Sequence, residues 1–174
     1  MKTRQVVIFN GKRFKVPEHI QRIDAASTHG WQVRYGPYKM FSDGTRDGSG
    51  AAASLERATK ELRKRIAKLP APTGLQTEPS ANKTSDLPVG ISGPIVRQRK
   101  DRNVPECSFG VHLPRFGQKP LRRSVYIASA NTYTVARYNE ALAKAVALRQ
   151  EAERLYQEDA TRAKRKAFRP AKPK

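Results

Sequence analysis

The sequence predicts an α+β protein, built from two copies of a small three-stranded antiparallel sheet with one packed helix and preceded by an N-terminal β-hairpin. Two observations predict this fold. Residues 31–68 and 107–156 repeat one order of short strand, turn, short strand and amphipathic helix. The chain has 174 residues, 37% hydrophobic and 7% aromatic, a composition that favours two modest cores over one large core.

The first predicted element is the hairpin. An apolar run at residues 6–9 is followed by Asn10 and Gly11 and then by a strand at residues 12–16. Asn-Gly suits the positive φ angles of a type I′ turn, the commonest two-residue hairpin connection. Residues 18–24 predict a further strand, and residues 27–30 a turn after it.

The next strand is expected at residues 31–35. Strict alternation places Trp31, Val33 and Tyr35 on one face, and Gln32 and Arg34 on the other, which is typical of a half-buried strand. A following strand is expected at residues 38–41. We expect a helix to cover the aromatic face, so that Trp31 and Tyr35 pack in the core.

That helix is predicted to open at Ala51, after a polar loop in which Asp47 or Ser49 is the expected N-cap. Pro70 and Pro72 are expected to end it. Its apolar stripe consists of Leu55, Ala58, Leu62, Ile66 and Leu69.

Proline, serine, threonine and glycine dominate residues 70–92, which predicts a flexible linker. Lys and Arg outnumber Asp and Glu by 15 to 6 in residues 1–70 and by 19 to 7 in residues 93–174. The positive charge therefore belongs to the parts on either side of the linker. The expected organisation is a hairpin and first module at 1–69, the linker at 70–92, a second module at 93–160 and a basic tail at 161–174.

The second module is expected to contain strands at residues 95–100, 109–113 and 125–127. Phe109, Val111 and Leu113 alternate with polar side chains, and Tyr126 points to the polar face. Asn131 or Thr132 is the expected cap of a long helix that keeps its period to about residue 156. Its apolar positions are Val135, Tyr138, Leu142, Ala145, Leu148, Ala152 and Leu155.

A formal net charge of +20 favours a polyanionic partner, and nucleic acid is the usual one. The single Cys107 excludes an intrachain disulfide and a thiolate cluster for zinc, in keeping with a reducing cytosol. The opening apolar run is too short for a signal peptide or a membrane span. We therefore expect a cytoplasmic, nucleoid-associated protein with no membrane partner.

No enzyme is expected. His112 and Arg115 fit the His-x-x-Arg pattern of tyrosine recombinases, with Tyr126 or Tyr133 downstream, but the motif falls in a strand and lacks its helical domain. The histidines show no metal-ligand spacing, and the glycines before the first helix lack the Lys-Ser/Thr of a phosphate-binding loop. No cofactor and no metal are expected.

The predicted arrangement of three strands and a helix resembles the Apetala-two-type DNA-binding domain and the arm-binding domains of phage integrases. Residues 31–35 match the second strand of that family and residues 124–129 its third strand. The resemblance covers roughly residues 18–69 and 93–150, and the family's tryptophan in strand three is absent from both. It implies that alternate side chains of the sheet read DNA, with Tyr126 as an aromatic contact.

A two- or three-stranded sheet can enter the major groove of B-DNA, where arginine pairs with guanine and glutamine with adenine. Cations in loops are expected to hold phosphates. The residues expected to contact DNA are Arg22, Gln32, Arg34, Lys39, Arg46, Arg97, Arg99, His112, Arg115, Arg122, Arg123, Ser124 and Tyr126.

The expected function is double-stranded DNA binding by a bacterial or phage-type transcriptional regulator. Three alternatives stay open at this point. They are a sequence-tolerant nucleoid-associated protein, an RNA-binding or ribosome-associated protein, and a protein–protein adaptor whose basic faces are merely solvated.

Overall fold

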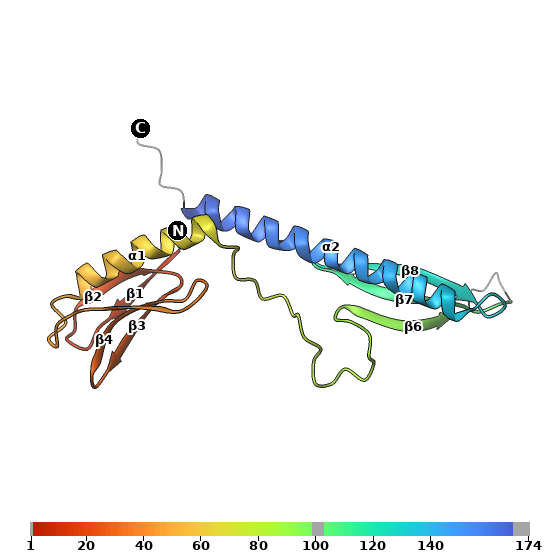
Figure 1. Ribbon diagram of the computed structural model, residues 1–174, viewed down its shortest axis with the longest axis horizontal. Coiled ribbons are helices and arrows are strands. Elements are labelled where there is room, and N and C mark those ends of the chain that lie inside the picture. Colours follow the sequence, from red (N-terminus) through yellow and green to blue (C-terminus); the bar gives the residue numbers. More distant parts are fainter. Residues whose placement is uncertain (1, 99–102, 169–174) are drawn as a thin grey trace. The chain divides into compact units, whose positions relative to one another are not determined.

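The computed structural model describes residues 2–98 and 103–168. Within them the fold is α+β, with antiparallel sheets of two, three and three strands and two helices (Figure 1). In chain order the elements are β1 (Thr3–Val7), β2 (Arg13–Pro17), β3 (Ile20–Ala25), β4 (Thr28–Val33), β5 (Lys39–Ser42), α1 (Ala51–Lys68), β6 (Ile91–Arg97), β7 (Glu106–Leu113), β8 (Leu121–Ser129) and α2 (Val135–Phe168). The chain divides into two compact units. The first runs to Pro72 and includes the stretch from Thr161, and the second is Thr73–Ala160.

The N-terminal hairpin is present, but its turn differs from the prediction. The Ile8 N–H donates to the Lys12 carbonyl oxygen and the Gly11 N–H to that of Ile8, so that three residues, 9–11, form the loop. Gly11 has φ 82°, whereas Asn10 is not among the residues with positive φ. The predicted type I′ turn is therefore wrong, because a three-residue loop needs one left-handed residue, at its end.

The first three-stranded sheet has the order β3-β4-β5, and α1 covers one of its faces (Figure 1). Trp31, Val33 and Tyr35 are fully buried beneath α1, as the alternation predicts. The turn predicted at residues 27–30 is wrong: it lies at residues 26–27, because Thr28 pairs with Ala25 and the strand continues from there. Ile8 and Val16 of the hairpin complete this core.

Helix α1 opens at Ala51 and ends before Pro70, as predicted, but its N-cap is Gly50 without a side-chain cap. The expected cap, Asp47 or Ser49, is wrong. Asp47 instead accepts hydrogen bonds from the backbone N–H and hydroxyl of Ser49, at 3.0 and 2.8 Å, inside the preceding loop. A short-range side-chain-to-backbone bond of this kind competes with capping.

The second three-stranded sheet has the order β6-β7-β8, with register shifts between Ser92 and Ile95 and after Cys107. Its buried face and α2 enclose the second core. That core contains Ile91, Phe109, Val111, Leu113, Val125, Ile127, Ala141 and Ala145. Helix α2 begins two to three residues later than predicted, at Val135. The Thr134 hydroxyl accepts the Arg137 N–H at 3.2 Å, whereas the hydroxyl of Thr132 accepts the N–H of Ser129.

Part of the predicted linker packs on the second unit. Leu87 is buried in the second core, and Lys83 Nζ donates to the carbonyl oxygens of Leu87 and Pro88. Strand β6 starts at Ile91, earlier than expected. Leu87 and Lys83 therefore help to anchor the end of this segment.

The end of α2 belongs to the first unit, where the sequence predicts a basic tail. The helix continues to Phe168, which packs against the first core. Lys164 forms an ion pair with Glu18 at 2.6 Å, and Arg165 Nε donates to the Ile66 carbonyl oxygen. The hydrogen bond from Lys164 holds the pKa of Glu18 below its ordinary value. These contacts are long-range, so the local sequence does not signal that the helix continues.

His19 connects β2 to β3 and is the one non-glycine residue with positive φ, at 66°, in the described part of the chain. Its ring packs edge-on against Tyr35, with the centroids 5.3 Å apart. The buried Nε2 atom has no hydrogen-bond partner among the residues described. Burial first, and then the charge of Lys164, hold the pKa of His19 below its ordinary value.

We expect the free energy of unfolding to fall as the pH falls below about 6.5. Unfolded His19 takes up a proton in that range more readily than folded His19, whose pKa is lower. This stability is therefore present above the unfolded pKa and is lost as the pH approaches the folded one. Asn tolerates the left-handed conformation, so His19→Asn should lose less stability between about pH 7 and pH 5. Urea unfolding at each pH, followed by Trp31 fluorescence, measures this, and equal losses would contradict it.

Candidate nucleic-acid interface

Each three-stranded sheet has a face that its helix does not cover, called its open face here. The strand register decides which residues lie on it, because directly paired residues share a face. In the first sheet, two rows of cross-strand neighbours lie on the open face. One row is Gln21, Gln32 and Met40, and the other is Ile23, Gly30 and Ser42. Arg34, two residues after Gln32, lies on the same face because side chains alternate along a strand. The first open face is thus mostly polar, with one arginine.

Arg34, Gln32 and Tyr38 form a cluster on this side. Arg34 Nε donates to Gln32 Oε1 at 2.7 Å, and its guanidinium lies 5.8 Å from the Tyr38 ring centroid. Among the residues that the structure describes, this contact uses Nε alone, so the two Nη groups keep their donors for an outside acceptor. Tyr38 is 75% exposed. The arrangement presents a planar cation and an aromatic ring together.

Arg22 does not lie on the open face, which corrects its predicted place. It pairs with Trp31 across the strands and so shares the helix-facing side, where its guanidinium sits 4.9 Å from the Trp31 ring. Its side chain is 6% exposed and is held by Asp43 and Asp24. Burial by itself lowers the pKa of Arg22, but hydrogen bonds to the two carboxylates outweigh it, so the pKa is raised. Arg22 is a structural cation.

Lys39 is also on the other side from its predicted place. It pairs with Val33, lies 5.3 Å from the Phe41 ring and approaches Glu61 of α1 at 3.9 Å. The reason is that the strand covers Lys39–Ser42, which puts residues 39 and 41 toward the helix. Arg46 is exposed in the loop before α1, consistent with a phosphate contact.

The second open face brings together five predicted residues. Across β7 and β8, Ser108 pairs with Tyr126, Gly110 with Ser124 and His112 with Arg122. Arg97 of β6 is level with Glu106 on the same side. Those five predicted residues are Arg97, His112, Arg122, Ser124 and Tyr126. All five are exposed, and Tyr126 keeps 55% of its surface in solvent.

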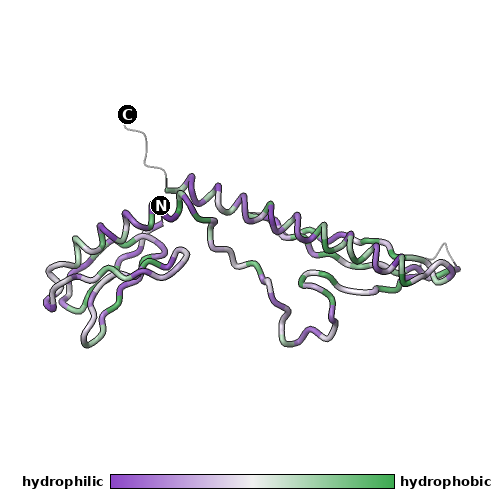
Figure 2. Tube along the Cα trace, in the orientation of Figure 1, coloured by the Kyte–Doolittle hydropathy of each residue, from purple (hydrophilic) through white to green (hydrophobic). Residues whose placement is uncertain are grey.

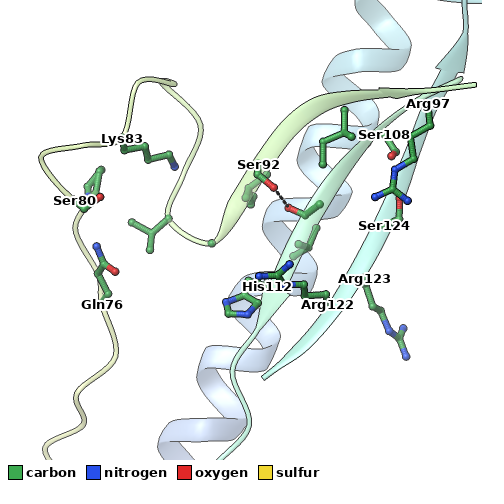
Figure 3. A pocket seen from close by; sticks show the side chains of 17 residues that line it. Gln76, Ser80, Lys83, Ser92, Arg97, Ser108, His112, Arg122, Arg123 and Ser124 are labelled. Atoms are coloured by element: carbon green, nitrogen blue, oxygen red, sulfur yellow. Dashed lines mark hydrogen bonds between the residues drawn. The ribbon is translucent and has the colours of Figure 1, made fainter. Parts of the chain in front are cut away.

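A hollow of about 680 Å³ lies over the second open face (Figure 3). Its floor is the sheet, with the hydroxyls of Ser92, Ser108 and Ser124, and its cationic side chains include Arg97 and Arg122. The segment 76–83 forms one wall and contributes Gln76, Ser80 and Lys83. Hydroxyl groups beside guanidinium groups can receive an anionic, hydrogen-bonding polymer such as a sugar–phosphate backbone.

Sequence reasoning missed this wall. Proline and serine in residues 70–92 are typical of a linker, and Lys83 is the one cation there. The available signal is Leu87, one of the few large apolar residues in this segment, because burying it draws the segment against the sheet.

The remaining predicted residues lie beside this face or away from it. Arg123 pairs with Val111 on the helix-facing side and points outward at the edge of β8, and it also lines the hollow (Figure 3). Arg115 is exposed in the loop between β7 and β8, where its guanidinium donates to the Lys119 carbonyl oxygen at 2.8 and 3.0 Å. Arg99 lies outside the residues described.

Two further findings concern residues 2–98 and 103–168. They contain no group of three or more His, Cys, Asp or Glu side chains placed to hold a metal ion. Neither helix has the length and apolar character that crossing a bilayer requires. Comparisons of this chain with protein-family models, with curated proteins and with solved structures find no match.

Proposed function

We propose that this protein binds double-stranded DNA by placing the open faces of its three-stranded sheets in the major groove. The observation that carries the proposal is the second open face, which gathers Arg97, His112, Arg122, Ser124 and Tyr126 on one exposed side. A net charge of +20 supports it, since neutralising phosphates supplies most of non-specific affinity.

The chemistry of the open faces favours the major groove. A sheet fits the major groove of B-DNA, which is about 12 Å wide, but not the minor groove. Arg34 and Arg97 can donate two hydrogen bonds to guanine O6 and N7, and each good pair is worth about 1–3 kcal/mol of base discrimination. Arg46, Arg115, Arg122 and Arg123 are exposed and suited to phosphates.

We further propose that the two sheet-and-helix parts are copies of one module, as in tandem Apetala-two-type domains, and that both engage one duplex. Two linked contacts benefit from a high effective concentration, so the chain binds more tightly than either contact alone. In this proposal the protein is a nucleoid-associated transcriptional regulator.

The proposal is tested by Arg34→Ala combined with Arg97→Ala. We expect the double variant to weaken binding to a sequence selected from random duplexes more than binding to a random duplex, by roughly 10- to 100-fold, because base-reading arginines discriminate. Fluorescence anisotropy at fixed salt measures both affinities. Lys12→Ala with Lys144→Ala removes the same charge away from both open faces and should weaken both duplexes equally.

Two outcomes separate the alternatives. A uniform loss across sequences in the Arg34 and Arg97 variant would assign these arginines to phosphates and favour a sequence-tolerant nucleoid protein. Competition by double-stranded RNA as strong as that by DNA would favour an RNA-binding protein, since the major groove of A-form RNA is too narrow for a sheet.

A further inference from the structure

Helix α1 carries a row of cations that the proposed DNA contacts do not use. The row, called the basic stripe here, consists of Arg57, Lys60, Lys64 and Lys68. Their spacing of three, four and four residues places them along one side of the helix. The four side chains are exposed, and none is in an ion pair with another described residue.

The basic stripe lies on the opposite side of the unit from the first open face. The residues of α1 that pack on the sheet are Ala51, Ser54, Ala58, Leu62 and Ile66. At 100° per residue, the stripe occupies the half of the helix that faces away from these buried residues. Figure 2 shows hydrophilic and hydrophobic positions interleaved along α1. One duplex lying on the open face is therefore separated from the stripe by the sheet and the helix.

The stripe works against helix stability. Lys60, Lys64 and Lys68 follow each other at intervals of four residues, and like charges at that spacing destabilise a helix. Only Arg57 has a polar partner in the described chain, the Ser42 carbonyl oxygen at 2.8 Å. Two acidic side chains lie near the stripe. Glu56 precedes Lys60 by four residues, and Glu61 lies near Lys64 but is engaged more closely by Arg65, at 2.8 Å, and by Lys39. Charges of mixed sign stabilise a solvated helix face more than charges of one sign do.

The dimensions and composition of the stripe fit duplex DNA. From Arg57 to Lys68 the helix rises about 16 Å, a length over which a duplex carries roughly nine or ten charges. The apolar side of α1 is buried in the first core, so the helix has no free apolar face to insert into a lipid surface. A rigid polyanion therefore suits this face better than a membrane does.

We infer that the basic stripe of α1 binds the phosphates of a second DNA duplex, so that one molecule bridges two duplexes. This inference rests on the proposed function, because the first duplex is held by the open faces. The stripe contacts phosphates alone and carries no sequence preference. With four such contacts, the affinity for the second duplex should fall about 100-fold between 50 and 200 mM salt.

The test uses the full chain and two duplexes, one on beads and one fluorescent in solution. The stripe variant combines Arg57→Gln, Lys60→Gln, Lys64→Gln and Lys68→Gln, since glutamine has nearly the same helix propensity. The control variant combines Lys12→Gln, Lys15→Gln, Lys144→Gln and Lys166→Gln, which removes the same charge at exposed sites elsewhere. Single-duplex affinity is measured separately by anisotropy, and folding by circular dichroism.

We expect the unchanged chain and the control variant to retain the fluorescent duplex on the beads. The stripe variant should lose retention at least about 100-fold while its single-duplex affinity stays within a few fold of the control. Its thermal unfolding should stay close to that of the control, because the repulsion that is removed among the lysines offsets the lost Arg57–Ser42 hydrogen bond.

Bridging that survives in the stripe variant would overturn the inference and assign bridging to two modules or two molecules. Single-duplex binding without any bridging would overturn the inference and leave the proposed function standing. Absence of single-duplex binding would overturn both, and retention of an acidic protein or of RNA, but not of the second duplex, would assign the stripe to that partner.

Discussion

Raising the salt concentration from 50 to 200 mM is expected to weaken binding of the full chain to duplex DNA by about 10³- to 10⁵-fold. This range corresponds to six to ten phosphate contacts, each of which releases condensed counterions. Exposed cations on or beside the open faces supply contacts of this kind. They include Arg46, Arg115, Lys119, Arg122 and Arg123, besides the base-facing Arg34 and Arg97.

The measurement is a series of anisotropy titrations at constant pH and temperature, plotted as the logarithm of the affinity against that of the salt concentration. Arg122→Gln with Arg123→Gln should reduce the slope by about two phosphate contacts. Arg22→Gln serves as a contrast, because that side chain is buried and held by Asp43. If the slope for the unchanged chain corresponds to only one or two phosphate contacts, the protein does not bind DNA through an extended interface.

Asp43→Ala is expected to lower the free energy of unfolding by about 3–5 kcal/mol, because it leaves a buried cation without its partner. The Asp43 side chain is 0% exposed and accepts two hydrogen bonds from Arg22, at 3.0 and 2.6 Å. It also accepts the Ser54 hydroxyl at 2.6 Å. One carboxylate thus joins β3, the loop before α1 and α1 itself.

Urea unfolding followed by the fluorescence of Trp31, the single tryptophan, measures this loss, since the indole packs against Arg22 and donates to the Ala51 carbonyl oxygen at 2.8 Å. Asp24→Ala is the matched control. Asp24 binds the same guanidinium at 2.8 Å but is 22% exposed, so water can replace it and the cost should be about 1 kcal/mol. If Asp43→Ala and Asp24→Ala lose the same free energy of unfolding, Arg22 and Asp43 do not form a specific buried ion pair.

Replacing both members of the pair provides a second check. Arg22→Met combined with Asp43→Leu should regain much of the loss, because apolar residues of similar volume often substitute for a buried ion pair without penalty. The double variant should also keep its affinity for DNA if Arg22 is purely structural. If this variant folds but binds DNA more weakly, Arg22 would have to be counted among the DNA contacts.

Local patterns predicted much of the secondary structure. Alternation at residues 31–35 identified the buried face of Trp31, Val33 and Tyr35, and Pro70 marked the end of α1. The errors lie at turns and caps, as at Asn10 and Thr132, where the choice depends on which nearby backbone group a side chain binds. Those choices involve small free energies that sequence patterns do not rank.

For the candidate interface, alternation was sufficient inside strands whose register matched the prediction, as for Gln32 and Arg34 on one sheet and His112 and Tyr126 on the other. The expected place of Arg22 was wrong: the resemblance to the DNA-binding domains puts the cations of the first strand among the DNA contacts, on the solvent side. The ion pair with Asp43 makes it favourable for Arg22 to lie on the helix-facing side. Asp43 is distant in the chain, so the sequence around residue 22 does not predict this partner.

By itself, the sequence determined the alternation of apolar and polar side chains, the α+β class and the strongly positive charge, since each depends on neighbouring residues or on composition. Tertiary structure alone decided that Arg22 is buried, that segment 76–83 walls the second open face and that Thr161–Phe168 packs with the first unit. The physical reason is that burial and ion pairing join residues far apart in the chain, and their free energy depends on groups that local patterns do not contain.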